Sequence, residues 1–215
     1  MKKISKIQNL VLMSLFAGII FMLAFSGIGY IQLGFIKATI IHVPVIVGSI
    51  LLGSKKGAFL GFLFGITSFI SNTFSPGIMS FAFSPLIFVP GTNSGSIMAL
   101  AICFIPRILV GVVPYYVFRL LRSLSKDRMN LLSFGIAGIA GAVTNTLLVM
   151  GGIYLLFKDS YAAVLKIPAD TVYKAVLTVI FTNGVPEALV AGILASALCQ
   201  TLVSNVQVRD MLEHF

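Results

Sequence analysis

Charged side chains are scarce in this chain, and acidic ones are the scarcest. Its 215 residues include 15 Lys and Arg and six Asp and Glu, which together make 10% of the sequence. A soluble globular domain has about 25% charged residues, so this composition excludes that class. Apolar residues make up 58% of the chain and the mean hydropathy is +1.06. We therefore predict an all-α integral membrane protein that forms one membrane domain over residues 1–215.

Cysteine and histidine are almost absent, and so are the motifs of common enzymes. Cys103 and Cys199 lie within apolar runs, which predicts inert core residues and excludes a disulfide framework. His42 has no Cys, Asp or second His beside it to make a metal site. The chain also lacks Gly-x-Ser-x-Gly, His-Glu-x-x-His and Walker A motifs. We assign no catalytic residue, metal or cofactor and predict a protein that is not an enzyme. Because the sequence has no nucleotide-binding motif, any energy from ATP must come from another chain.

The net charge of +9 does not indicate a nucleic-acid partner. The basic residues form no patch interleaved with aromatic residues. They lie in short gaps between apolar runs, where membrane topology places them. A basic start followed by the apolar run 7–28 resembles a signal peptide, but the run is too long. We predict a retained first helix.

Apolar runs predict six membrane spans. About 20 helical residues, at about 1.5 Å each, cross the ~30 Å hydrocarbon core. The second run is short for a full crossing, and the last two are long enough to tilt or protrude. The runs are roughly 8–28, 40–52, 58–73, 97–118, 131–157 and 171–203.

Basic residues predict that both termini are cytoplasmic, because Lys and Arg favour cytoplasmic loops. The side that carries the termini holds Lys2, Lys3, Lys6, Lys55, Lys56, Arg119, Arg122, Lys126, Arg128 and Arg209. The other side holds Lys37, Lys158, Lys166 and Lys174. The long uncharged loop 74–96 is then outside, and a loop of that length is more often functional, such as a lid, than idle.

Small residues recur on one face of several spans, where they let helix backbones approach closely in lipid. In the third and fifth spans we interpret these stripes as intrachain packing; they are Gly57, Gly61, Gly65, Ser68 and Asn72, and Gly138, Ala142, Asn145, Val149 and Gly152. In the first span Ser14 and Gly18 form a small-xxx-small pair beside Ala17. This pair indicates either intrachain packing or docking of another protein.

Arg107 is the one charge within residues 97–118, and a charge there costs about 2.5–3.5 kcal/mol on insertion scales. Asn183 and Glu187 share a helical face because they are four residues apart. In the predicted topology Arg107 and Glu187 reach toward the outer half, beneath the long loop. The predicted pocket is lined by Arg107, Asn72, Asn145, Asn183, Glu187, His42 and Lys37.

Each member of this polar set also has a structural interpretation. Glu187 can simply neutralise Arg107, since charges in the membrane pair with one another. The asparagines can tie helices together, and a lone histidine such as His42 is usually a core residue. A ligand-free structural subunit and an intramembrane enzyme therefore stay open as alternatives.

Four stretches resemble a known family. They are Gly34 to Pro44, Gly57 to Gly65, Pro106 to Gly111 and Thr182 to Ala188. Together with six spans in about 200 residues and the long outer loop, they resemble the substrate-binding S component of energy-coupling factor (ECF) vitamin transporters. The pantothenate type is the most similar.

The resemblance implies a division of labour. The S component binds a vitamin in the bacterial plasma membrane, while a transmembrane coupling protein and two ATPases supply the work. Docking would use Ser14, Ala17 and Gly18, where the family usually has Ala-x-x-x-Ala. Pantothenate is a carboxylate that suits Arg107. Another vitamin, such as a hydroxymethylpyrimidine or folate, is the alternative.

Overall fold

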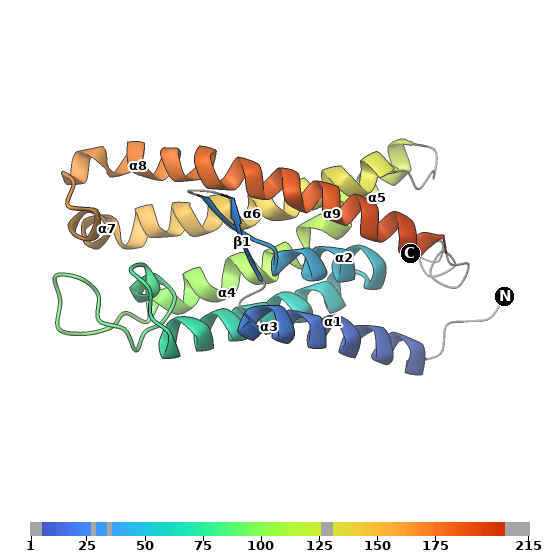
Figure 1. Ribbon diagram of the computed structural model, residues 1–215, viewed down its shortest axis with the longest axis horizontal. Helices are drawn as coiled ribbons and strands as arrows, with labels where there is room; N and C mark the ends of the chain where they lie inside the picture. Colours follow the sequence, from blue (N-terminus) through green and yellow to red (C-terminus); the bar gives the residue numbers. More distant parts are fainter. Residues whose placement is uncertain (1–5, 27–28, 34–35, 126–130, 205–215) are drawn as a thin grey trace.

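The computed structural model describes residues 6–26, 29–33, 36–125 and 131–204. Long helices run along the longest axis of the molecule and form one bundle (Figure 1). The elements are α1 (Lys6–Ser26), β1 (Tyr30–Leu33), β2 (Ile36–Thr39), α2 (His42–Leu52), α3 (Ser54–Phe74), η1 (Ser80–Ala82), α4 (Met98–Val110), α5 (Val113–Leu124), α6 (Leu131–Leu156), α7 (Lys158–Leu165), η2 (Ala169–Thr171), α8 (Val172–Val179), η3 (Ile180–Gly184) and α9 (Val185–Val203).

Five stretches of helix in the described chain are long and apolar enough to cross a membrane. They are Ile7–Ser26, Ser54–Phe74, Met98–Leu124, Leu131–Leu156 and Ala169–Val203. Each overlaps one of the predicted spans, so the helical membrane class is confirmed. The predicted end of the first span at Ile28 lies outside the described residues.

The second predicted span is a short helix, α2, of 11 residues, and every one of them is buried. At about 1.5 Å per residue it extends only ~16 Å along the bundle. Its side chains, including Val45, Ile46 and Ile50, belong to the main core with residues of α1, α3 and α9. A helix that is apolar all round is buried on every side, which explains its central place.

A β-hairpin precedes α2, in the gap between the first two predicted spans. Strands β1 and β2 pair antiparallel, with Tyr30 opposite Thr39 and Leu33 opposite Ile36. Ile40 N donates to Gly29 O at 2.9 Å and closes the base of the hairpin. Pairing satisfies the backbone groups of an extended segment. The fold is therefore helical with one small hairpin rather than helical throughout.

Glycines bring α3 and α4 into backbone contact. A Cβ on Gly57 would meet the Gly111 carbonyl, and a Cβ on Gly61 would meet the Arg107 carbonyl. In α6, a Cβ on Gly138 would lie 2.8 Å from the Ala191 carbonyl of α9. The predicted intrachain role of the two small-residue stripes is thus confirmed.

Prolines interrupt the fourth and sixth spans. Helix α4 ends at Val110, and Pro114 lies in the first turn of α5, where its missing N–H does least harm. In the last span the π-helical turn η3 lies directly before α9, whose first turn contains Pro186. Proline and π-turns are the usual causes of such interruptions.

Candidate functional site

Arg107 lies in the last turn of α4 and is 7% exposed. Its Nη1 donates to the Ile102 carbonyl at 2.9 Å, and its Nη2 makes a longer contact of 3.4 Å with Ser68 Oγ of α3. The predicted cation is therefore inside the bundle, in contact with two of its helices. We call Arg107 with Phe64, Ser68, Phe83 and Ile102 the Arg107 cluster.

Two aromatic rings flank the guanidinium. Its central carbon lies 4.8 Å from the centroid of Phe83 and 5.6 Å from that of Phe64. A guanidinium within about 6 Å of a ring face gains roughly 0.5–2 kcal/mol, most where water is excluded. Phe83 belongs to the segment between α3 and α4. The predicted lid thus contacts the predicted binding residue.

Polar side chains connect the segment between α3 and α4 to the end of α3 through hydrogen bonds. Ser80 Oγ donates to Asn72 Oδ1 at 2.7 Å, and Asn72 Nδ2 donates to the Ser68 carbonyl at 2.8 Å. The hydroxyls of Thr73 and Ser84 are 2.8 Å apart. Ser80 and Ser84 are almost fully buried, so these bonds fix the start of the segment. Asn72 therefore has a structural role here, and its role toward a ligand stays a prediction.

Glu187 lies beside the hairpin in the first turn of α9. Its Oε1 accepts a hydrogen bond of 2.7 Å from the backbone N–H of Thr39. Glu187 thus links the hairpin to α9, and its place in one site with Arg107 stays a prediction.

His42 and Asn145 carry buried polar atoms without partners. Both ring nitrogens of His42 and the Oδ1 of Asn145 lack a hydrogen-bond partner among the described residues. His42 is 2% exposed at the start of α2, and Asn145 is half-buried in α6. Burying such groups without a bond costs about 1–3 kcal/mol. A ligand that supplies the missing bonds would recover this cost.

The last two residues of the predicted pocket are Asn183 and Lys37. Asn183 is half-buried in the π-turn, and its Oδ1 accepts a bond of 3.3 Å from the neighbouring Thr182 hydroxyl. Lys37 belongs to β2, but its side chain is outside the part that the structure describes. In the described chain no three His, Cys, Asp or Glu side chains form a group that would hold a metal.

Sequence reasoning missed the contacts that hold Arg107. From its spacing Ser68 was predicted only as a packing residue, and Phe64 was not predicted as part of the site. Pro106, directly before Arg107, was a usable signal, because a proline in a helix frees the carbonyl four residues earlier. That carbonyl belongs to Ile102, the acceptor found here.

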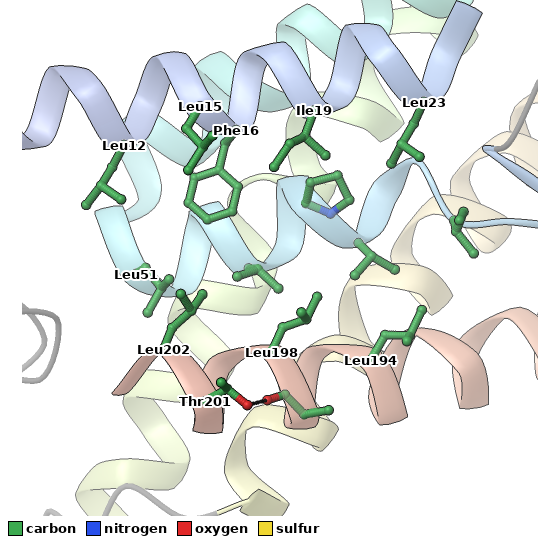
Figure 2. A pocket seen from close by; sticks show the side chains of 15 residues that line it. Leu12, Leu15, Phe16, Ile19, Leu23, Leu51, Leu194, Leu198, Thr201 and Leu202 are labelled. Carbon is green, nitrogen blue, oxygen red and sulfur yellow. Dashed lines mark hydrogen bonds between the residues drawn. The ribbon is translucent and has the colours of Figure 1, made fainter. Parts of the chain in front are cut away.

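A separate groove of about 500 Å³ lies between α1, α2 and α9. Figure 2 shows apolar side chains of all three helices converging on it, among them Phe16, Leu51 and Leu198. The Thr201 hydroxyl donates to the Ala197 carbonyl of its own helix at 2.8 Å. Such a lining offers nothing to a carboxylate, so the groove is not the candidate site.

Helix α1 presents the predicted docking pair on its outer side. Ser14 and Gly18 are exposed, and a Cβ on Gly18 would meet nothing within 4 Å. Ala17 is half-buried and packs against the main core. The pair therefore takes no part in close packing within the described chain.

Comparison with known proteins shows the family. The sequence model described as "ECF transporter, substrate-specific component" matches residues 8–199. The Pantothenic acid transporter PanT of Lactococcus lactis subsp. cremoris (strain MG1363) is 41% identical over 167 residues, which are 78% of this chain and 78% of the relative. The Pantothenate transporter PanT of Leuconostoc mesenteroides subsp. mesenteroides is 27% identical over 208 residues, 93% of this chain and 94% of the relative. The chain therefore belongs to the substrate-specific components of ECF transporters, which are multi-pass transport subunits of the bacterial plasma membrane and not enzymes.

Proposed function

We propose that this protein binds pantothenate for uptake that a separate ECF module energises, with a transmembrane coupling protein and two ATPases. The observation that carries the proposal is the buried guanidinium of Arg107, which lies close to the rings of Phe64 and of Phe83, a residue of the segment 75–97. Its planar fork matches the geometry of a carboxylate. The two relatives named for pantothenate transport support the choice of vitamin.

The remaining site residues have roles that suit the rest of the ligand. His42 and Asn145 contribute unpartnered polar atoms for the hydroxyl and amide groups of pantothenate. Asn72, Asn183 and Lys37 complete the rim, and the segment that carries Phe83 closes over it. Glu187 lowers the net positive charge of the proposed site and holds the hairpin through the N–H of Thr39.

We also propose six crossings in a single membrane domain, with both termini cytoplasmic. The hairpin and α2 together would make the short second crossing. This topology is supported by Figure 1, where α1 begins and α5 and α9 end at one end of the bundle, opposite the segment 75–97. Five of the basic residues behind the orientation, Lys2, Lys3, Lys126, Arg128 and Arg209, lie outside the described residues.

Cysteine labelling tests the topology. Asn93→Cys is expected to react with a membrane-impermeant maleimide added to whole cells, and Lys55→Cys only after lysis. Both positions are exposed, and both native cysteines are buried, so background labelling is low. Labelling of Lys55→Cys in intact cells would contradict the orientation.

Docking on the coupling protein is proposed for the face of α1 that carries Ser14, Ala17 and Gly18. The support is their small size and the open space outside Gly18. Small residues allow two membrane helices to approach closely.

Calorimetry with the purified protein tests the vitamin and the site together. Arg107→Ala is expected to abolish pantothenate binding while the protein still inserts and folds, and Arg107→Lys to retain part of it. A thermal-shift panel of other vitamins serves as the control for specificity. Unchanged pantothenate affinity in Arg107→Ala would refute the role of the arginine. Stabilisation by a different vitamin and not by pantothenate would show that this vitamin is the ligand.

A further inference from the structure

Pro106 and Arg107 act on the same backbone carbonyl. In an α-helix the N–H of residue 106 would donate to the carbonyl of Ile102, but proline has no N–H. The structure shows Arg107 Nη1 in its place, 2.9 Å from that carbonyl. Pro106 thus leaves the Ile102 carbonyl without its helical donor, and Arg107 donates to it instead.

The replacement of a backbone donor by the arginine side chain matters because both residues are buried. Ile102 is 3% exposed and Arg107 is 7% exposed, so water has little access to either. A buried carbonyl without a donor is unfavourable, and a bond from a charged donor is stronger than a neutral one. The arginine is therefore held back toward the beginning of α4, in the direction that helical side chains favour.

We propose that Pro106 is a positioning residue that orients Arg107 for the carboxylate of the substrate. The inference rests on the proposed function, because it gives Arg107 an anion to bind. A side chain already fixed in one rotamer loses less conformational freedom when a ligand arrives. The bond to Ile102 supplies that fixation, together with the rings of Phe83 and Phe64, whose centroids lie 4.8 and 5.6 Å from the guanidinium carbon.

Pro106→Ala is the direct test. The new N–H competes for the Ile102 carbonyl, which still has a second lone pair, so the arginine is loosened rather than released. We expect pantothenate to bind roughly three- to tenfold more weakly, as is typical of one additional side chain to immobilise. Pantothenol, the neutral analogue with an alcohol in place of the carboxylate, is expected to bind as it does to the wild type.

The control variants separate the two hypotheses. Pro114→Ala removes a proline from the first turn of α5, where no helical bond is lost, and should leave the ratio of the two affinities unchanged. Arg107→Ala should remove the preference for the carboxylate. If it does not, the proposed role of Arg107 fails. If Arg107→Ala removes the preference and Pro106→Ala leaves pantothenate affinity intact, the positioning role alone fails.

Two further measurements guard against a general structural effect. In the Arg107→Ala background pantothenate is not expected to bind, so Pro106→Ala is compared there with pantothenol, whose affinity should stay unchanged because the partner of the proline is gone. Equal weakening of both ligands by Pro106→Ala would overturn the proposal. Pro106→Ser restores the same N–H and is expected to behave like Pro106→Ala, so it provides the result if the alanine variant does not fold.

Discussion

Replacing Gly61 by alanine tests whether the close approach of α3 to α4 builds the Arg107 cluster. A methyl group at this position would point at the backbone of α4, 2.9 Å from both the Arg107 carbonyl carbon and the Ile108 Cα. Carbon atoms pack best at about 3.5–4.0 Å, so the helices must separate locally by ~0.6 Å or more. Because the obstacle is backbone, no side chain can rotate to relieve it.

The expected cost follows from these contacts. Overpacking of a filled interior costs about 1–3 kcal/mol, and alanine recovers roughly 0.5–1 kcal/mol of helix propensity over glycine. We therefore expect a net loss of ~0–2.5 kcal/mol in unfolding free energy, together with weaker vitamin binding because Ser68 and Arg107 move apart.

Gly151→Ala in α6 is the matched control, since its added methyl group would meet nothing within 4 Å. Thermal unfolding in detergent and calorimetry with pantothenate, on both variants and the wild type, measure the two effects. The control should keep the affinity of the wild type. If Gly61→Ala matched Gly151→Ala in stability and affinity, the packing of α3 on α4 would not determine the geometry of the site.

Three other substitutions address the lid, the charge balance and the docking face. Ser80→Ala leaves Asn72 Oδ1 without its donor at 2.7 Å and costs about 1–3 kcal/mol; we expect faster proteolysis of the segment 75–97 and faster vitamin release in stopped-flow experiments. Glu187→Gln keeps an oxygen for Thr39 N but removes a negative charge from the proposed site, so the affinity for the pantothenate anion should rise several-fold. A fall in affinity would show that the carboxylate itself binds the ligand. Gly18→Leu projects into open space, so vitamin binding should persist while transport by the assembled complex falls; unchanged transport would exclude docking there.

The sequence predicted those features that depend on composition and helical spacing. Gly57 and Gly61 lie at a spacing of four, which places them on one face, and that face is the one in contact with α4. The run 40–52 was too short for a crossing, and α2 is short. Such features are local to one helix, so they can be read without knowing its neighbours.

The hairpin and the contacts of Arg107 depend on tertiary structure instead. Strands of four residues are too short for alternation of apolar and polar residues to distinguish them from a turn. Phe83 reaches Arg107 across an irregular segment, and Thr39 reaches Glu187 from a position 148 residues away. Neither contact corresponds to a repeating pattern in the sequence, so periodicity alone could not predict it.

A proline explains why the charge of Arg107 is tolerated where it lies. A membrane-spanning helix must satisfy its backbone groups within the protein, and an interior proline leaves one carbonyl without a donor. Polar side chains that are costly elsewhere in the bilayer are useful beside such a break. Arg107 follows Pro106 and supplies the donor that the Ile102 carbonyl lacks. Glu187 satisfies a different backbone group, because its Oε1 accepts the N–H of Thr39 in the hairpin. Arg107 and Glu187 thus each satisfy a backbone group in this structure, and these bonds restrict the orientation of both side chains.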